Sequence, residues 1–322
     1  MNGMKKILIT GGAGFIGSNF IHYFLAKHPD VHIVNLDKLT YCGNLENLAG
    51  LEKEPRYEFV KGDICDPEAV SRAIEGADAV IHFAAESHVD NSIQDPLVFT
   101  KTNVLGTHVF LEEARKRKIA RFVHISTDEV YGSVREGSSK ETDPLIPSSP
   151  YSASKAAAEL IVQGFFRTFG FPAVIVRGSN TFGPHQYPEK LIPLFATNLL
   201  EAKKVPLMGD GMHRRSWVYV RDFCRAVERV LIHGELGEIY NIPGTVELPN
   251  IEVTKRILPL LGKDESCIER VPDRLAHDRR YSVDGAKLMA LGWKPEHDFD
   301  SALKETVAWY AEHEAWWKKL KK

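Results

Sequence analysis

The sequence predicts a doubly wound α/β fold, in which helices cover both faces of a parallel sheet and a smaller mixed α/β domain is attached. Apolar, β-branched runs alternate with helical stretches through the first half of the 322 residues. The runs are almost continuously hydrophobic, as strands buried on both faces must be. Alternating strands and helices favour right-handed crossovers within one sheet. After about residue 180 proline, glycine and surface-type residues increase, which marks the second domain.

Six strands and four helices are expected in the first half. The strands lie at 5–10, 31–37, 57–63, 77–85, 121–127 and 171–179, and the helices at 15–28, 67–75, 103–116 and 152–169. A further strand is expected at 237–244. We therefore expect the sheet domain to comprise residues 1–180 and roughly 217–245, and the smaller domain to comprise 181–216 and 246–322.

The end of the chain predicts one amphipathic helix over residues 300–322. Leu303, Val307 and Tyr310 recur at helical spacing and would line its docked face. The tryptophans of this stretch are interpreted as packing residues rather than as a binding platform; they are Trp309, Trp316 and Trp317.

Composition excludes several classes of function. The formal charge of −2 gives no general drive toward nucleic acid or a membrane surface. No apolar run approaches the roughly 20 residues that span a bilayer, and the N-terminus runs directly into a strand, unlike a signal peptide. The four cysteines are scattered, which fits free thiols in a reducing cytoplasm; they are Cys42, Cys65, Cys224 and Cys267. The histidines show no metal-ligand spacing, so we expect no metal.

The first strand runs into a glycine-rich turn that opens a helix. Gly11, Gly14 and Gly17 would allow the tight turn, the approach of backbone amides to a pyrophosphate, and close packing of helix on strand. The next strand ends on Asp37, 20 residues after Gly17, where a carboxylate can bind both hydroxyls of an adenosine ribose. This context predicts a Rossmann dinucleotide site and favours NAD over NADP, although Lys38 lies next to the acid.

Other polar residues follow the strand ends, where the loops of such a sheet gather on one rim. Asp63 ends the third strand, and its position fits contact with an adenine edge and a helix cap before Pro67 equally well. The segments 84–88 and 126–132 end the fourth and fifth strands, so we expect both on the same rim.

Tyr151 and Lys155 stand four residues apart at the start of a helix and therefore share one face. An ammonium favours a nearby phenolate, which can accept a proton from a sugar hydroxyl as hydride leaves for nicotinamide. Lys155 can also hold the nicotinamide ribose. A surface pair worth a few tenths of a kcal/mol is the structural alternative, and the glycine turn upstream favours the catalytic interpretation.

The fifth strand ends on two adjacent acids, Asp128 and Glu129. They could form a polar turn that stops the strand, or a pair of proton-transfer groups above a reacting carbon. Partial burial and proximity help to keep one of two such acids protonated near neutral pH. Adjacent side chains of a strand point to opposite faces, so the chain must turn at Asp128 and bend away over 130–132.

An ordered set of motifs runs through nearly the whole chain: GGAGFIG, LDKLTYCGN, GDICD, HFAAESHVD, STDEVYG, YSASK, PEKLIP and HDRRYSVD. This set closely resembles the extended short-chain dehydrogenases that modify nucleotide sugars, and among them the 4,6-dehydratases. The main discriminator is the triplet of Thr127, Asp128 and Glu129. Relatives that epimerise C4 usually lack the acid pair, and decarboxylases and GDP-mannose dehydratases typically read Thr-Ser-Glu.

The resemblance implies a reaction that needs both acids. Tyr151 and NAD would oxidise the sugar at C4, and the ketone would make the C5 hydrogen acidic enough for Glu129 to remove. Asp128 would protonate the departing C6 hydroxyl, and the hydride would return to C6. Thr127 would hydrogen-bond the C4 oxygen beside Tyr151, unless strand propensity alone explains it.

The resemblance also implies binding roles. The cofactor would contact Gly11, Gly14, Phe15, Ile16, Gly17, Asp37, Lys38, Thr40, Asp63, Ile64, Ala84, Ala85, Ser87, Thr102, Ser126, Tyr151 and Lys155. The substrate would contact Glu86, His88, Thr127, Asn180, Lys190, Leu191, Arg215, Asn250, Arg274 and His277. Asn103 would support the nicotinamide region. Glu86, His88 and Asn103 fit ordinary loop hydrogen bonds equally well. Arg215 suits a diphosphate because its planar fork bonds two oxygens, whereas Arg214 and Arg279 are interpreted as surface charges.

The implied substrate is dTDP-glucose, and the implied assembly is a homodimer paired through the helices at 103–116 and 152–169. A UDP-sugar 4,6-dehydratase, a nucleotide-sugar 4-epimerase and a non-catalytic NAD sensor remain alternatives, although the sensor should lack the Tyr-x-x-x-Lys pair. Departures from the family pattern leave the choice of thymine or uracil and the C2 substituent open; they are Thr181, Phe182, Ser216 and Arg221.

Overall fold

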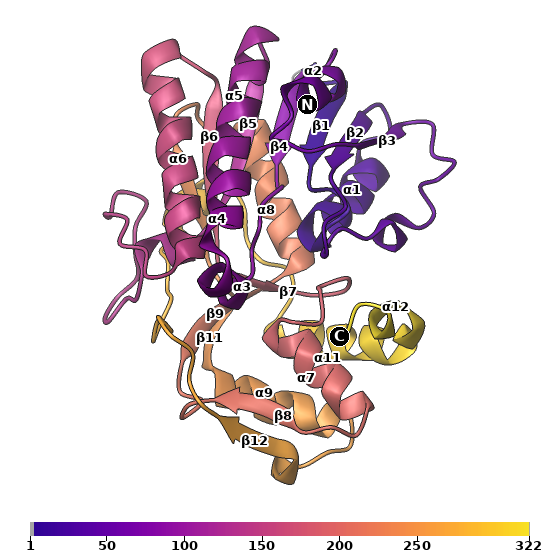
Figure 1. Cartoon of the computed structure of the whole chain (residues 1–322), viewed down its shortest axis with the longest axis vertical. Coiled ribbons are helices and arrows are strands. Elements are labelled where there is room, and N and C mark those ends of the chain that lie inside the picture. Colours follow the sequence, from indigo (N-terminus) through magenta and orange to yellow (C-terminus); the bar gives the residue numbers. More distant parts are fainter. Residues whose placement is uncertain (1–2, 322) are drawn as a thin grey trace.

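The computed structural model describes residues 3–321 and contains the predicted parallel sheet, with helices on both faces (Figure 1). Its seven strands run in the order β10-β6-β5-β4-β1-β2-β3, and all neighbours are parallel. Their bounds are β1 (Lys6–Thr10), β2 (His32–Asp37), β3 (Tyr57–Lys61), β4 (Ala79–His82), β5 (Arg121–Thr127), β6 (Ala173–Gly178) and β10 (Ile239–Ile242). The strand order reverses between β1 and β4, and ligands of such sheets bind outside the carboxyl ends at this point.

Each face of the sheet has its own core, because successive strand residues point to opposite sides. Ile7 and Ile9 pack with α1 (Phe15–Lys27) and α8 (Val220–His233). Leu8 belongs to the other cluster, with side chains of α2 (Pro67–Ala73), α5 (Thr107–Lys116) and α6 (Pro150–Phe169). Burial on both faces explains why the strands read as continuous apolar runs.

Two helices begin differently from the prediction. The helix expected at 103–116 is preceded and partly replaced by a π-helical segment, Thr100–Gly106, and the α-helical part, α5, begins at Thr107. Two short helices, α3 (Val89–Gln94) and α4 (Pro96–Phe99), come before the π-helical segment. Helix α6 starts before residue 152, because Ser149 caps it and forms a reciprocal capping box with Ser152. The cap fixes where Tyr151 enters the helix.

The smaller region lies beyond the carboxyl ends of the sheet (Figure 1). It contains a three-stranded sheet of β7 (Asn180–Phe182), β9 (Arg214–Tyr219) and β11 (Val246–Pro249), and the pair of β8 (Val205–Met208) with β12 (Ile268–Val271). Its helices include α7 (Leu191–Leu200), α9 (Asn250–Leu260) and α10 (Ala286–Ala290). The chain crosses back to the main sheet for α8 and β10 between these elements.

The prediction of one helix over 300–322 is wrong. Helix α11 spans Phe299–Glu312, His313 leaves the helical conformation, and α12 (Glu314–Lys318) follows; residue 322 lies outside the described residues. The break lets the fully buried Trp317 fold back, where its indole N–H donates to the Tyr310 carbonyl at 2.8 Å. Leu303, Val307 and Tyr310 are buried as predicted. Within residues 3–321, the helices are too short or too polar to cross a bilayer.

Candidate active site

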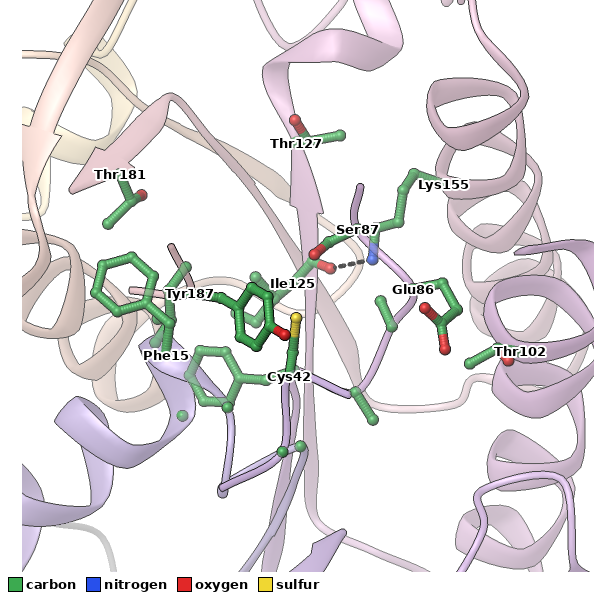
Figure 2. Close-up of a pocket in the computed structure, with 18 of the residues that line it drawn as sticks. Phe15, Cys42, Glu86, Ser87, Thr102, Ile125, Thr127, Lys155, Thr181 and Tyr187 are labelled. Carbon is green, nitrogen blue, oxygen red and sulfur yellow. Dashed lines mark hydrogen bonds between the residues drawn. The ribbon is translucent and has the colours of Figure 1, made fainter. Parts of the chain in front are cut away.

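A cavity of about 320 Å³ opens at the carboxyl ends of the strands, where the order of the sheet reverses. Its walls come from the glycine turn, the ends of β2 and β5, the loop after β4, the start of α6 and the segment 178–190. Figure 2 shows Glu86 and Thr102 on one side of this cavity, and Phe15, Cys42 and Tyr187 on the other.

The glycine turn closely approaches the loop after β4. Gly11 has φ of +70°, and a Cβ there would lie 2.7 Å from the Ala84 backbone; a Cβ on Gly17 would lie 2.4 Å from the Gly11 carbonyl oxygen. Gly14 is the N-cap of α1, with extended backbone. Only glycine therefore fits the first and third positions, and the exposed helix N-terminus suits a pyrophosphate. The turn fits the dinucleotide that the spacing predicts.

Asp37 is buried at the end of β2, and its two oxygens accept hydrogen bonds from the Ala13 and Leu39 amides at 2.9 and 2.8 Å. Burial raises the pKa of Asp37, and these backbone donors oppose the rise. Its carboxylate therefore fastens the glycine turn to β2 at the cavity wall. Each oxygen keeps a lone pair that can accept a ribose hydroxyl.

Lys38 forms an ion pair with Asp63 at 2.7 Å, and both residues line the cavity. The Asp63 carboxylate raises the pKa of Lys38 through a hydrogen bond. This pairing neutralises the cation that could otherwise attract a 2′-phosphate. Asp63 does not cap the following helix, because Asp66 is the N-cap of α2; the alternative that Asp63 is a cap is wrong.

Every residue expected at the cofactor lines this cavity: Gly11, Gly14, Phe15, Ile16, Gly17, Asp37, Lys38, Thr40, Asp63, Ile64, Ala84, Ala85, Ser87, Thr102, Ser126, Tyr151 and Lys155. The buried Ser126 hydroxyl has no hydrogen-bond partner among the described residues. Sequence reasoning missed other lining residues, chiefly Cys42, Gln186, Tyr187, Glu189 and Phe223. Cys42 and Glu189 lie inside quoted motifs and Tyr187 lies next to one, so those motifs were the signal that could have identified these three residues.

A tight turn at the end of the fifth strand separates the side chains of Thr127, Asp128 and Glu129. A 3-10 turn covers Asp128–Tyr131, and the Thr127 hydroxyl oxygen accepts a hydrogen bond from the Glu129 backbone N–H at 3.2 Å. Gly132 then adopts φ of +72°, where a Cβ would lie 2.2 Å from the Ile146 carbonyl oxygen. The predicted turn at Asp128 and bend over 130–132 are therefore present, and both acids line the cavity.

Asp128 is 3% exposed, so the acid pair is more than a polar end to the strand. Burial, followed by the charge of Glu129, raises its pKa to about 8, against the opposing effect of Arg215. One of its oxygens is near the Thr127 hydroxyl at 3.3 Å, and Oδ2 has no partner among the described residues. At neutral pH Asp128 therefore carries a proton and can donate it to a group in the cavity.

Tyr151 and Lys155 are buried in the same wall, on the first turns of α6. Burial and the Glu129 charge raise the pKa of Tyr151, while the Thr127 hydroxyl lowers it. Lys155 donates to the Ile125 carbonyl at 2.6 Å (Figure 2), and burial lowers its pKa to about 8. The lysine is therefore directed at the strand backbone, and Tyr151 is a neutral phenol at neutral pH.

Behind Glu129 lies a buried layer from the smaller region. The Tyr281 hydroxyl lies 3.4 Å from Glu129 Oε2 and donates to Asp278 Oδ2 at 2.8 Å. The Arg215 guanidinium stacks on the Tyr281 ring at 4.3 Å and donates to the Asp278 carbonyl at 2.9 Å. Arg215 is therefore close to the acid pair, while Arg214 and Arg279 form exposed pairs with Glu247 and Asp210 as expected.

The residues expected at the substrate divide into two groups. Glu86, Thr127, Asn180 and Lys190 line the cavity; His88, Leu191, Arg215, Asn250, Arg274 and His277 do not. His88 lies between Asp90 and Glu189, and Arg274 is 3.8 Å from Asp90. Asn103 bonds both the amide and the carbonyl of Glu86, so it fixes the loop after β4.

His213, Asp273 and His277 form a cluster that sequence spacing did not reveal, because His213 comes from a segment distant from the other two residues. Each histidine pairs with the aspartate, at 3.3 and 2.5 Å, and their rings stack face to face at 3.6 Å. Parallel rings this close cannot both direct an in-plane lone pair at one ion. Burial and the Arg274 charge lower the pKa of His277 to about 4, and because the two rings are stacked we interpret the cluster as a hydrogen-bonded support.

Comparisons with known proteins agree with this geometry. The model of the GDP-mannose 4,6 dehydratase family matches residues 8–306. A dTDP-glucose 4,6-dehydratase of Streptomyces niveus is 48% identical over 98% of this chain and 96% of its own. The dTDP-glucose 4,6-dehydratase DesIV of Streptomyces venezuelae, solved with NAD bound, has 50% identity and a TM-score of 0.96 over 98% and 100% of the two chains. That of Bacillus anthracis, also solved with NAD, has 47% identity and a TM-score of 0.92 over 98% and 100%.

Proposed function

Because this chain belongs to the GDP-mannose 4,6 dehydratase family, within the extended short-chain dehydrogenases, we propose that it converts dTDP-glucose to dTDP-4-keto-6-deoxyglucose. It is an NAD-dependent hydro-lyase. The observation that carries the proposal is the pair of acids at the end of β5, with Asp128 buried and protonated and Glu129 beside it, in the same cavity wall as Tyr151. A simple hydride exchange at C4 needs no such pair.

The glycine turn, Asp37 and the Lys38–Asp63 pair would hold NAD along the cavity. When NAD is bound, it would act as a temporary hydride carrier, accepting the hydride from C4 and returning it to C6. Tyr151 would accept the C4 hydroxyl proton, with Thr127 beside it. The high pKa of a buried phenol must fall for this step, and Lys155, pKa about 8, supplies a nearby positive charge when its ammonium is present.

The two acids would then divide the elimination of water. Glu129 removes the C5 proton, which the C4 ketone has made acidic, and its carboxylate becomes a carboxylic acid. Asp128 gives its proton to the C6 hydroxyl, which leaves as water. Asp128 suits donation because burial keeps it protonated, and proton transfer by positioned groups of this kind typically contributes about 10²–10⁴-fold in rate.

A panel of nucleotide sugars tests this proposal. The purified chain is incubated with dTDP-glucose, UDP-glucose and UDP-N-acetylglucosamine, and the alkaline absorbance of a 4-keto-6-deoxy product is measured. We expect product with dTDP-glucose. Product with a UDP-sugar alone would make the chain a UDP-sugar dehydratase, and C4-inverted hexose without ketone would make it an epimerase.

We propose that two copies of the chain pair through α5 and α6, which lie side by side on one face of the sheet (Figure 1). Apolar side chains are exposed on and next to these helices: Leu97, Val98, Leu105, Leu160 and Phe169. Exposed apolar patches of this kind commonly mark contacts between proteins.

We further propose that residues 1–180, with roughly 217–245, hold NAD and that residues 181–216 and 246–322 hold the sugar nucleotide. We also propose a cytoplasmic location, because the four cysteines are free thiols.

A further inference from the structure

Three side chains connect the acid Glu129 to the protein surface. Glu129 Oε2 lies 3.4 Å from the Tyr281 hydroxyl, which donates to Asp278 Oδ2 at 2.8 Å. The Ser148 hydroxyl donates to the same oxygen of Asp278. Tyr281 and Asp278 are buried, whereas Ser148 is exposed. The route therefore leads from the cavity wall to solvent through groups that can each accept and release a proton.

The local structure holds Tyr281 between the two carboxylates. Ser216, which departs from the usual family residue, donates its hydroxyl to the Tyr281 carbonyl at 3.3 Å. Arg215 covers the ring at 4.3 Å and also bonds the Asp278 carbonyl at 2.9 Å. Both contacts involve backbone atoms or the ring face, so the phenolic hydroxyl itself is left to the two carboxylates.

One phenolic hydrogen forms its stronger bond with only one of two carboxylates. The shorter distance assigns this hydrogen to Asp278, so the phenolic oxygen keeps a lone pair that can accept a hydrogen bond from a protonated Glu129. This arrangement becomes a complete chain of donors when Glu129 is protonated, because its new O–H can then donate to Tyr281. Hydrogen bonds of catalytic groups are often long before substrate binds, as the 3.4 Å distance is here.

We propose that Tyr281 and Asp278 carry protons between Glu129 and solvent during turnover. The proposal rests on the function proposed above, in which Glu129 acquires the C5 proton while the sugar covers the cavity. The Glu129 O–H bond breaks as an O–H bond forms on Tyr281, whose own proton moves to Asp278. The proton then passes from Asp278 to Ser148, which releases its original proton to water. The reverse sequence delivers a solvent proton to Glu129 for return to C5, and no net charge or electron is transferred.

Turnover in D₂O tests this relay by a measurement made on the product. The chain and its variants are incubated with dTDP-glucose, and deuterium at C5 of the 4-keto-6-deoxy product is measured by mass spectrometry or NMR. We expect nearly complete C5 deuteration with the unchanged chain. Tyr281→Phe keeps the ring beneath Arg215 but breaks the relay, so most of its product should retain the original C5 hydrogen.

Asp278→Asn provides a second interruption that leaves the backbone carbonyl available to Arg215. Product formed by Asp278→Asn should also retain the original C5 hydrogen, and this variant replaces Tyr281→Phe in the test if Tyr281→Phe fails to fold. The matched control is Tyr219→Phe, because Tyr219 is equally buried and its hydroxyl has no partner in the described part of the chain. The control should deuterate C5 like the unchanged chain, since loss of a buried hydroxyl alone does not change the isotopic content of each product molecule.

The outcomes separate two hypotheses. Full C5 deuteration by folded Tyr281→Phe or Asp278→Asn overturns the relay and leaves the dehydratase assignment intact. Absence of product from the unchanged chain overturns the proposed function instead, whereas product without C5 deuterium from the unchanged chain overturns the relay.

Discussion

At the scale of single residues, the site depends on how differently neighbouring groups are solvated. Asp128 is nearly fully buried, with a pKa raised to about 8, whereas Glu129 faces both the cavity and Tyr281. Two carboxylic acids in different environments can take opposite roles in one proton transfer, which is the usual basis for assigning an acid and a base. Arg215 lowers the pKa of Asp128, so any anion that pairs with this arginine, such as a diphosphate, weakens that effect and changes the pKa of Asp128.

The raised pKa of Asp128 predicts a pH-dependent effect on stability. The folded chain holds this proton up to about pH 8, whereas an unfolded aspartate releases it near pH 4. The contribution of Asp128 to the free energy of unfolding is therefore fully present below about pH 4 and is lost as pH rises toward 8. Asparagine does not titrate, so Asp128→Asn does not lose this contribution. The free energy of unfolding of the variant minus that of the unchanged chain should therefore increase by at least ~1 kcal/mol between pH 5 and about 8. Denaturant titrations at several pH values measure the difference, and a difference independent of pH would contradict the assigned protonation.

Tyr151 predicts a loss of the first chemical step. Tyr151→Phe keeps the buried ring but cannot accept the C4 hydroxyl proton, so turnover should fall by at least ~10²-fold. The near-ultraviolet absorbance of reduced NAD should not develop on addition of dTDP-glucose. Binding of dTDP, measured by calorimetry, should be unchanged and serves as the control for folding. Unchanged turnover would refute this role for Tyr151.

The sequence was sufficient to place the residues expected at the cofactor in one cavity, through strand ends and the family resemblance, although it missed others such as Tyr187 and Phe223. It was not sufficient for the layer behind Glu129, because Tyr281 is 152 positions away and arrives through a loop of the smaller region. The contact between Lys155 and the Ile125 carbonyl was likewise not foreseen, since the spacing to Tyr151 specifies a helix face and not the direction of a long side chain.

At the scale of elements, the break between α11 and α12 has a consequence for the cofactor turn. The Trp316 indole N–H donates to Asn47 Oδ1 at 2.9 Å, and the Asn47 amide donates to the Ala13 carbonyl at 2.9 Å. Ala13 lies inside the glycine turn. An uninterrupted helix would lack the bend after His313 that precedes Trp316, and amphipathic periodicity alone does not reveal such a break.

This contact predicts that Trp316→Phe weakens the binding of NAD. Loss of one hydrogen bond, worth about 1 kcal/mol, should raise the Kd for NAD by about fivefold. Trp293→Phe is the matched control, because its buried indole N–H also donates one hydrogen bond, to the Asp222 carbonyl at 3.1 Å, and its loss should leave the Kd unchanged. Calorimetric titration of both folded variants measures the effect. An equal change in the two variants would show that Trp316 does not act through the glycine turn.

At the scale of the whole molecule, the cavity lies where the main sheet meets the smaller region. One side carries the glycine turn and the acid pair, and the other contributes Asn180, Tyr187 and Lys190 to the lining. Lys190 donates to the Ser87 carbonyl at 2.9 Å and thereby connects the two sides. The alternation of strands and helices predicted the sheet correctly, but the path of the smaller region depends on contacts between residues far apart in sequence.

The proposed pairing through α5 and α6 predicts a defined change in mass. Leu160 is 59% exposed on α6, and a charge there would be buried without a partner in the dimer. Leu160→Glu should therefore halve the mass measured by light scattering at micromolar concentration. Leu236→Glu, at a residue that is 44% exposed in the loop before β10, should keep the mass of the unchanged chain. A monomeric unchanged chain would contradict the pairing.

The division of labour between the two acids is tested most directly by Glu129→Gln mixed with dTDP-glucose in D₂O. The variant keeps Tyr151 and the NAD cavity, so C4 oxidation should proceed and the absorbance of reduced NAD should appear and persist. The C5 hydrogen should not exchange with deuterium, because glutamine cannot remove it. Undiminished C5 exchange in this variant would show that Glu129 is not the base and would contradict the account.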